Sequence, residues 1–288
     1  MAVGLCCFVL ASTGCAIRPY VVDEAATALS SQSQMPEDDL VLAREASAFY
    51  LKLSESLLRE VPGHLKLAAA VSSGFTQYAY AFVSFEADKL EPQDAAAAQK
   101  LRERAARLYA RAHRHAMAAL EASSPGLSKA LTQTDDVKTL RFTQDQVALA
   151  YWAAASWGGL ISLSKDNPDV VADLPAAVRL AHLAWRHQPD FAQGALASLM
   201  GTFEASRPGG SVQQASLYFE QAMTASASKS AGVYVAKAEN IALSQGDRAQ
   251  FEALLQRALE VAARHRNLQN DIMRERAEWL LGMADDLF

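Results

Sequence analysis

Four arginines in the first half of the chain could form a cationic strip. They recur at intervals of three, four and three residues, as Arg104, Arg107, Arg111 and Arg114. Because residues at these intervals share one face of a helix, the four guanidinium groups are predicted to point in one direction. Such a strip could bind an acidic partner, a carboxylate ligand or lipid headgroups. The pattern is also typical of the solvated side of an amphipathic helix. We favour that interpretation, because charge stripes on exposed helix faces are the ordinary case.

A cluster of aromatic residues lies near the middle of the chain, at Tyr151, Trp152 and Trp157, followed by Gly158 and Gly159. Aromatic side chains are favoured anchors in partner interfaces and ligand pockets, so one of them could line a ligand path or a partner pocket. The alternative is that they fill the core while Gly158 permits close helix packing. We favour the alternative, because large aromatic side chains dominate the energetics of cores.

The segment Ala205–Gly210 ends in a pair of glycines just before an expected helix. Backbone N–H groups at such a position could bind an anion. The segment could equally serve only to turn the chain, with Ser211 as the N-cap of the helix, and glycine pairs usually have that simpler role.

Metal-binding and catalytic motifs are missing from the sequence. The six histidines have poor spacing for a shared metal ion: His64, His113, His115, His182, His187 and His265. The sequence contains no G-x-S-x-G, G-x-G-x-x-G or Walker motif. Acidic and basic residues alternate near the end of the chain, which is typical of helix-surface ion pairing or C-terminal packing: Arg274, Glu275, Arg276, Glu278, Asp285 and Asp286. We predict no metal, no cofactor and no catalytic residue.

Cys15 follows a short apolar run and three small residues, Ser12-Thr13-Gly14. The run, Ala2–Ala11, is too short to span a membrane but suits the apolar region of a signal peptide. The arrangement resembles a bacterial lipoprotein signal, in which the Cys thiolate takes a diacylglyceryl group. Two departures are the lack of Lys or Arg in Met1–Gly14 and a Ser at position 12, where Leu is usual. The alternative is an ordinary cleaved signal.

These features predict a signal peptide over residues 1–14, a lipidated Cys15 and a tether over residues 15–34. Acyl chains on Cys15 would hold the protein firmly to a leaflet. Ala16, rather than Asp, follows the cysteine. By resemblance to enterobacterial sorting, this predicts the periplasmic leaflet of the outer membrane.

The composition is that of a folded, mildly acidic protein. The chain has 288 residues, with 27 Lys and Arg against 32 Asp and Glu, and 51% of its residues are hydrophobic. This composition excludes a mostly disordered chain and disfavours nucleic-acid binding. The three cysteines all lie within the first 15 residues, which excludes a disulfide scaffold.

The rest of the chain is predicted to be helical. Apolar residues recur at three and four positions, as in Leu101, Ala105, Leu108, Ala112, Ala116 and Leu120, and again in Leu268, Ile272, Trp279, Leu280 and Met283. Sustained alternation of apolar and polar residues is not found, so strands are not expected. Turn dipeptides predict the breaks between helices. They lie at Pro62-Gly63, Glu91-Pro92, Ser124-Pro125-Gly126, Asn167-Pro168, Gln188-Pro189, Arg207-Pro208-Gly209-Gly210 and Gly246-Asp247. We predict one all-α domain over residues 35–288.

Four segments match the Ala-x₃-aromatic-x₂-Ala pattern of tetratricopeptide (TPR) helices, with varying quality. Two fit well, Ala105-x₃-Tyr109-x₂-Ala112 and Ala215-x₃-Phe219-x₂-Ala222. Two are partial, Ala177-x₃-Ala181-x₂-Ala184 and Ala46-x₃-Tyr50-x₂-Leu53. Their irregular spacing predicts degenerate helical hairpins with insertions.

The order of several segments in the second half brings a family into view. These are YWAAASWGGL (Tyr151–Leu160), HQPDFAQG (His187–Gly194), RPGGSVQQASLYFEQAM (Arg207–Met223), YVAKAENIALSQGDRAQFEALLQRAL (Tyr234–Leu259) and NDIMRERAEWLLGMADDLF (Asn270–Phe288). With GCAI at Gly14–Ile17, the chain resembles the TatT component family. Members of that family are TPR-containing lipoproteins associated with tripartite ATP-independent periplasmic (TRAP) transporters.

The resemblance implies an all-α fold of TPR-like hairpins stacked in a right-handed superhelix. It also implies a non-catalytic accessory protein that forms a homo-oligomer, with a trimer expected. The implied partner is the periplasmic solute-binding protein of a TRAP system, and the chain could enclose a ligand path. Two other classes stay open: a generic TPR adaptor assembling an unrelated outer-membrane or cell-wall complex, and a lipoprotein enzyme with an unrecognised site.

Overall fold

A computed structural model of the chain describes residues 24–29, 39–133 and 140–288. All regular elements in these ranges are helices, which confirms the predicted all-α class. They are α2 (Leu40–Glu60), α3 (Leu65–Ala79), η2 (Tyr80–Ser84), α4 (Phe85–Leu90), α5 (Ala95–Ser123), α6 (Leu127–Thr132), α7 (Gln144–Ser162), α8 (Pro168–Val171), α9 (Leu174–His187), α10 (Phe191–Ser206), α11 (Val212–Ala225), α12 (Ala231–Lys237), η4 (Ala238–Ala242), α13 (Arg248–Arg264), α14 (Leu268–Gly282) and α15 (Ala284–Leu287). The labels η2 and η4 denote π-helical segments.

The predicted turn dipeptides all fall between helices or at helix starts. Local side chains explain why. Asn167 caps α8 by accepting from the N–H groups of Asp169 and Val170, with Pro168 at the first helical position. Asp247 caps α13 in the same way, through the N–H of Gln250. Capping side chains satisfy backbone donors that have no partner inside the helix, so these boundaries follow from local chemistry.

Residues 24–29, which lie within the predicted tether, form a short helix. Ala26 of this helix is fully buried in the main core. The Thr27 hydroxyl lies 3.3 Å from Nε2 of His64, the residue that caps α3. A small apolar side chain and one polar contact thus fix this segment to the folded body.

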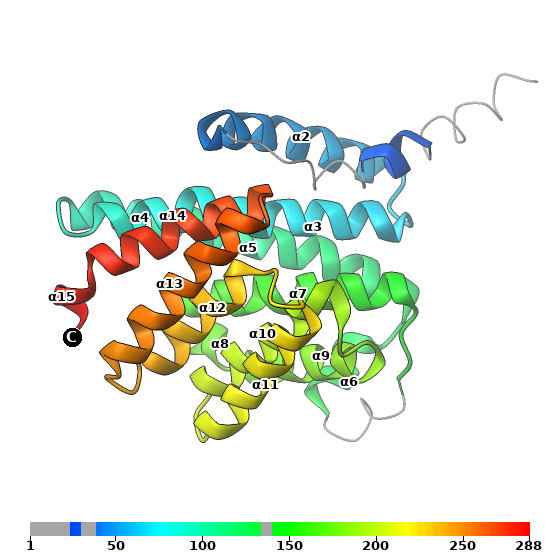
Figure 1. Cartoon of the computed structure of the whole chain (residues 1–288). Helices are drawn as coiled ribbons and strands as arrows, with labels where there is room; N and C mark the ends of the chain where they lie inside the picture. The colour runs from blue at the N-terminus through cyan, green and yellow to red at the C-terminus, as the bar shows by residue number, and fades with distance from the viewer. Residues whose placement is uncertain (1–23, 30–38, 134–139) are drawn as a thin grey trace, which may run out of the picture.

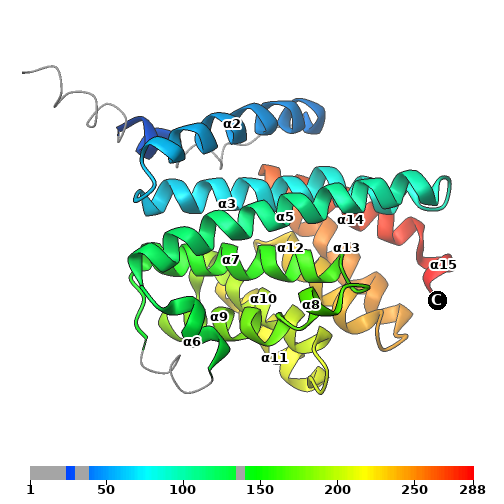
Figure 2. The ribbon, with the colours of Figure 1, turned by 180° about the vertical axis from the view of Figure 1, so that it is seen from behind.

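The helices pack in series along the chain. Helix α2 packs on α3, α3 on α5, α5 on α7 and α7 on α9, while α10 pairs with α11 and α13 with α14. Figures 1 and 2 show α2 as the outermost helix at one end of the molecule and α11 at the opposite end. The main hydrophobic core runs through α3, α5, α7, α9 and α10, and a second cluster joins α12, α13 and α14.

Three of the four TPR-like matches occupy buried seams, and one does not. The matching residues of α5, α9 and α11 are all buried: Ala105, Tyr109, Ala112, Ala177, Ala181, Ala184, Ala215, Phe219 and Ala222. In α2, by contrast, Tyr50 and Leu53 are 46% and 43% exposed. The reason is that α2 packs on α3 through a different seam, which includes Ala43, Leu51 and Leu58. A superhelix of TPR-like hairpins stays a prediction.

The sequence pattern did not indicate two π-helical segments, one inside a continuous helix and one at the end of a helix. Segment η2 joins α3 to α4, and η4 follows α12 directly. A π-helical turn rotates the residues that follow it relative to a regular helix, and such turns are often found at functional positions. Both segments supply partners to one buried arginine, Arg276, described below.

Candidate functional site

The four arginines of α5 do not act as one strip. Arg104, Arg107 and Arg114 are exposed. The guanidinium of Arg104 lies 6.0 Å from the ring centroid of Tyr78. Arg111 instead turns toward α2, where its Nε and Nη2 donate to the two carboxylate oxygens of Glu55 at 2.5 and 2.6 Å. Three of the four guanidinium groups therefore remain at the surface, and one ties two helices together.

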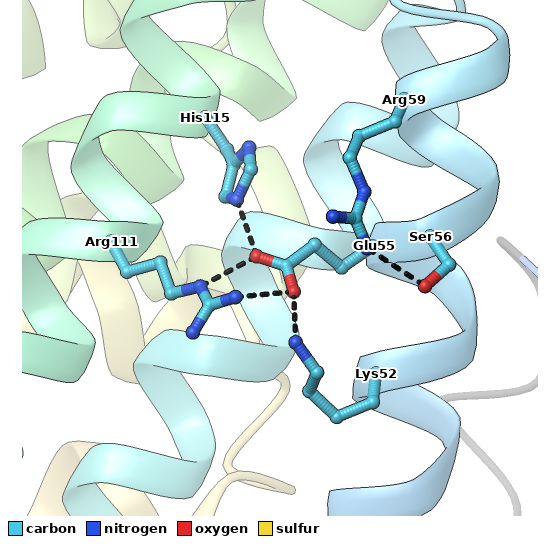
Figure 3. A network of polar contacts seen from close by, with 6 residues as sticks. All are labelled: Lys52, Glu55, Ser56, Arg59, Arg111 and His115. Atoms are coloured by element: carbon cyan, nitrogen blue, oxygen red, sulfur yellow. Dashed lines mark hydrogen bonds and ion pairs between the residues drawn. The ribbon is translucent and has the colours of Figure 1, made fainter.

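Glu55 is the centre of a polar hub between α2 and α5 (Figure 3). Its side chain is only 4% exposed. Besides Arg111, it accepts from Nζ of Lys52 at 2.6 Å and from Nε2 of His115 at 2.9 Å. The ring of Phe75 stacks on His115 and lies under the Arg111 guanidinium, 4.9 Å from its centroid. We refer to Lys52, Glu55, Arg111 and His115 as the Glu55 hub.

The hub changes the acidity of Glu55. Burial by itself would raise the pKa of this carboxyl, but hydrogen bonds from Lys52, Arg111 and His115 outweigh burial and lower the pKa to about 2. Glu55 thus stays ionised in the folded protein far below the pH at which an ordinary glutamate is protonated. The contacts of the hub join α2 to α5.

The aromatic residues of α7 pack in two separate places. Trp157 lies against His113 of α5, with ring centroids 4.3 Å apart, and its indole N–H donates to Asp173 at 3.3 Å. Desolvation lowers the pKa of His113, although its contact with the Ala153 carbonyl opposes that shift. The surroundings of Trp157 are therefore those of a residue that joins α5, α7 and the start of α9.

Tyr151 and Trp152 pack at the second of these places, near the start of α10. The ring of Tyr151 is 4.7 Å from that of Trp152 and 5.3 Å from that of Phe191, at the start of α10. Burial raises the pKa of the Tyr151 phenol to about 12. These contacts are packing contacts, and neither ring is among the residues that line the two grooves described below.

Gly158 and Gly159 let neighbouring helices approach α7 closely. A Cβ atom at Gly159 would lie 2.7 Å from ring carbons of Tyr109, and one at Gly158 would lie 2.9 Å from the ring of Phe203. Real Cβ atoms do not come this close, so α7 can hold these two rings only with glycine at both positions. The aromatic of the α5 TPR-like match thus fills the space that a glycine leaves on the paired helix.

We predict that Gly159→Ala destabilises the protein by about 1–3 kcal/mol, because the Tyr109 ring is buried and cannot move without disturbing the α5–α7 contact. Urea unfolding measures the change. Gly282→Ala is the matched control, since a Cβ there meets nothing within 4 Å at the end of α14. Equal stability of the two variants would contradict the prediction.

The segment Ala205–Gly210 leads from the end of α10 into a turn, in which the N–H of Arg207 donates to the Phe203 carbonyl and that of Gly210 to the Arg207 carbonyl. The carboxylate of Glu204 accepts from the backbone N–H of Ser211 at 2.8 Å and forms two hydrogen bonds with Arg207, each 2.8 Å long. Ser211 caps α11 through the N–H of Gln214 at 3.2 Å. Glu204 therefore occupies the position that an exogenous anion would take.

A groove that the sequence did not predict lies between the α9–α10 turn and α11. Its volume is about 500 Å³, and it is lined by Trp185, Pro189, Asp190, Leu217, Glu220, Gln221, Thr224 and Ala225. Leu217 is 51% exposed at its edge. The indole N–H of Trp185 is buried and finds no acceptor among the described residues. An apolar groove with an unused donor suits a side chain or backbone carbonyl of a partner.

The backbone beside this groove is strained. Ala192, Gln193 and Gly194 have φ values of 48°, 55° and 86°, in the left-handed region that residues with a Cβ rarely adopt. A Cβ at Gly194 would lie 2.6 Å from the carbonyl oxygen of Ala222 in α11. Strained backbone is often found at functional positions, and here it follows closely after Asp190, which lines the groove. In the sequence, this region was singled out only as HQPDFAQG, one of the segments that carry the family resemblance.

A second, smaller hollow of about 360 Å³ lies near the end of α9. It is lined by Phe142, Gln144, Val147, His187 and Gln188. Nε2 of His187 is buried there without a partner among the described residues. Two unpartnered ring nitrogens, on Trp185 and His187, therefore flank the same end of α9.

Arg276 of α14 is one of the residues for which the sequence predicted helix-surface ion pairing or C-terminal packing. It forms a largely buried set of contacts, which we call the Arg276 latch. Its side chain is 12% exposed, and it donates to Glu239 of η4 at 2.6 and 3.1 Å and to Asp88 of α4 at 3.2 Å. Its guanidinium lies 5.4, 5.2 and 5.8 Å from the ring centroids of Tyr80, Phe85 and Trp279. Asp285 does pair near the surface, with Arg248 at 2.7 Å.

The described residues also bear on metal sites and membrane spans. Within the described ranges, no group of three or more His, Cys, Asp or Glu side chains is arranged to hold a metal ion. In the same part of the chain, no helix has both the length and the apolar content to span a bilayer. Cys15, the predicted lipidation site, and the signal at residues 1–14 lie outside the described residues.

The fold and these sites define a helical scaffold that presents open grooves. Residues 36–288 match the model of the TRAP transporter T-component family, TAtT, and the chain therefore belongs to that family. The resemblance inferred from the sequence is thus confirmed. The chain is also similar to an uncharacterised protein of Treponema pallidum (strain Nichols), with 26% identity over 317 aligned residues that cover all of this chain and 98% of that protein. Membership indicates an accessory, envelope-associated role in a TRAP system, in a family not known as catalytic.

Proposed function

We propose that this protein is a non-catalytic, lipid-anchored scaffold that docks the periplasmic solute-binding protein of a TRAP system. The observation that carries the proposal is the family match across residues 36–288, which covers nearly all of the described structure. Series of packed helices present extended surfaces to which another protein can bind. Acylation of Cys15 and an outer-membrane location belong to the same proposal, as does assembly into a homo-oligomer, with three copies expected.

The groove between the α9–α10 turn and α11 is the better of two docking surfaces. It combines an exposed aliphatic side chain, Leu217, with the unused indole N–H of Trp185 and two acidic residues at its rim, Asp190 and Glu220. An apolar centre with a charged rim is the usual anatomy of a protein interface. The partner would place an apolar side chain against Leu217 and basic groups near the rim.

The second surface is the exposed part of the arginine strip, Arg104, Arg107 and Arg114. These side chains would meet acidic residues of a partner at the edge of an interface. Rim charges mainly affect the rate of association and its salt dependence, whereas buried apolar anchors determine the affinity. The two surfaces therefore predict different effects when they are changed.

We predict that Leu217→Asp weakens binding of the cognate solute-binding protein by about tenfold or more, since it replaces an exposed apolar side chain at the edge of the groove with a charge. Binding is measured by calorimetry, with the signal segment removed and the partner encoded beside the TRAP permease. Leu287→Asp is the control, because Leu287 is similarly exposed at the far end of the chain. Arg107→Glu is expected to slow association at low salt.

The outcomes separate the parts of this proposal. Unchanged affinity in Leu217→Asp, with normal binding by the wild type, would show that the groove is not the docking surface. No binding by the wild type would overturn docking itself. Recovery of a cell-wall or outer-membrane complex in place of the solute-binding protein would favour the generic adaptor.

A further inference from the structure

Helix α2 carries a second apolar stripe that faces away from the protein. Among the described residues, nine large hydrophobic side chains are markedly exposed, and five of them belong to this one helix: Val41, Leu42, Phe49, Tyr50 and Leu53. Leu42, Ala46, Phe49 and Leu53 recur at intervals of four, three and four, which places them in one line along the helix. Phe49 is 66% exposed. We refer to Leu42, Ala46, Phe49, Tyr50 and Leu53 as the outer stripe.

The outer stripe cannot turn inward, because the opposite face of α2 is fixed. Ala43, Leu51 and Leu58 are buried against the body. Glu55 on the same side is held by Arg111 and His115 of α5. Figures 1 and 2 show α2 as the outermost helix, and α3 is its main neighbour. The stripe is thus a permanent feature of the surface, presented in one direction.

Chain length ties this surface to the proposed lipid anchor. Glu24, the first residue of the short helix at residues 24–29, follows Cys15 by nine residues, which span at most about 30 Å. That helix is fixed to the body by buried Ala26 and by the contact of Thr27 with His64. His64 lies just after the end of α2. An acylated Cys15 would therefore keep Glu24 within about 30 Å of the leaflet, and the short helix that begins there contacts the junction of α2 and α3.

The chemistry of α2 suits a lipid surface. An interfacial helix has aromatic and aliphatic residues on one face and polar residues, often basic, beside them. On α2, the edge next to the outer stripe carries Lys52 and Arg59, seven residues apart, together with Glu45. Tyr50 adds an aromatic ring with a polar tip, the kind of side chain that prefers the headgroup region.

We propose that α2 lies on the membrane leaflet that holds the lipid anchor, with Phe49 and Leu53 inserted at the boundary of headgroups and acyl chains. This inference rests on the proposed acylation of Cys15. In that orientation α11, at the opposite end of the molecule, faces away from the membrane (Figure 1). The groove between the α9–α10 turn and α11 is then open to a soluble partner, and the protein has a single orientation on the membrane.

The test uses the acylated protein in vesicles of phosphatidylcholine and phosphatidylglycerol. Cys6 and Cys7 leave with the signal and Cys15 is blocked by its acyl groups, so an introduced cysteine is the only free thiol. Phe49→Cys and Leu217→Cys are each labelled with an environment-sensitive NBD dye. Both positions are exposed, so neither variant should disturb folding. We expect a lipid-attached doxyl quencher to remove most of the emission at position 49 and almost none at position 217.

Three results would overturn the inference, each in a distinguishable way. Equal quenching at both positions would show that α2 has no preference for the leaflet. A buried dye at position 49 without quenching, in a protein of twice the monomer mass or more, would show that a second copy covers the stripe. Protein that leaves the vesicles on washing would overturn the anchor itself. Binding of the solute-binding protein is measured separately, in solution. A failure of docking can therefore be told apart from a failure of α2 to lie on the membrane.

Discussion

Arg276→Ala is expected to lower the free energy of unfolding by about 3–5 kcal/mol at neutral pH, the cost of breaking a buried ion pair from one side. The change leaves the carboxylates of Glu239 and Asp88 facing each other in a partly buried position without their shared cation. It also opens a space among three aromatic rings that the guanidinium now fills. The substitution therefore removes a charge, its hydrogen bonds and its packing at the same time.

The latch matters because it joins parts of the chain that are far apart. Asp88 precedes Arg276 by 188 residues and lies on α4, whereas Glu239 belongs to η4 in the second hydrophobic cluster. Both π-helical segments contribute, since Tyr80 belongs to η2. Removing the arginine should therefore loosen the contact between the two clusters before it unfolds either of them. Limited proteolysis is expected to cleave Arg276→Ala near α12 sooner than the wild type.

Two comparisons isolate the cause. Arg248→Ala removes an arginine that also has two acidic partners but is 47% exposed, and it should cost far less stability than Arg276→Ala. Arg276→Lys keeps the charge but loses the planar group that stacks on the rings, so its stability should be intermediate. Urea unfolding followed by circular dichroism measures all three variants. If Arg276→Ala costs no more than Arg248→Ala, the latch does not hold the clusters together.

The same residue shows what the sequence could and could not predict. Helix boundaries were predictable, because Asn167 and Asp247 cap helices through atoms two or three residues away. For Arg276 the sequence left helix-surface pairing and C-terminal packing both open, because it shows only the acidic neighbours along the chain. Its true partners are 37 and 188 residues away, and no periodic pattern records such a distance.

The candidate sites show the same limit. The spacing of the α5 arginines predicted their shared helix face, and three of them are indeed exposed. The partner of Arg111 lies 56 residues earlier on a different helix, so its inward role was hidden. The TPR-like pattern likewise matched α2 in composition, yet Tyr50 and Leu53 point outward. A pattern records residue types, whereas burial depends on which face the neighbouring helix covers.

The Glu55 hub should make the stability of the protein depend on pH. The folded pKa of Glu55 is about 2, below the ordinary value of 4.5 that applies in the unfolded chain. Between these values the unfolded state binds more protons than the folded state, so stability rises with pH. The contribution is fully present above about pH 5 and is lost as the pH falls toward 2. It amounts to about 2–3 kcal/mol, after allowance for the partly exposed Lys52 and Arg111.

We therefore expect Glu55→Gln to be less stable than the wild type by about 2–3 kcal/mol at pH 7 and nearly equal to it near pH 2.5, where the carboxyl of the unfolded chain is protonated. Urea unfolding at a series of pH values measures the difference between the two proteins. Glu45→Gln is the control, because Glu45 is an exposed residue of the same helix. A difference that does not shrink on acidification would show that Glu55 stabilises the fold through packing alone.

The Glu55 hub also bears on the orientation of α2. The hub provides the polar contacts between α2 and α5, and α2 has few other neighbours besides α3. Glu55→Gln keeps the shape of the side chain but removes the charge that Lys52, Arg111 and His115 share. If α2 lies on a membrane, the dye at position 49 should therefore report a broader range of depths in Glu55→Gln than in the parent protein. Unchanged quenching together with reduced stability would show that α3 alone sets the direction of the outer stripe.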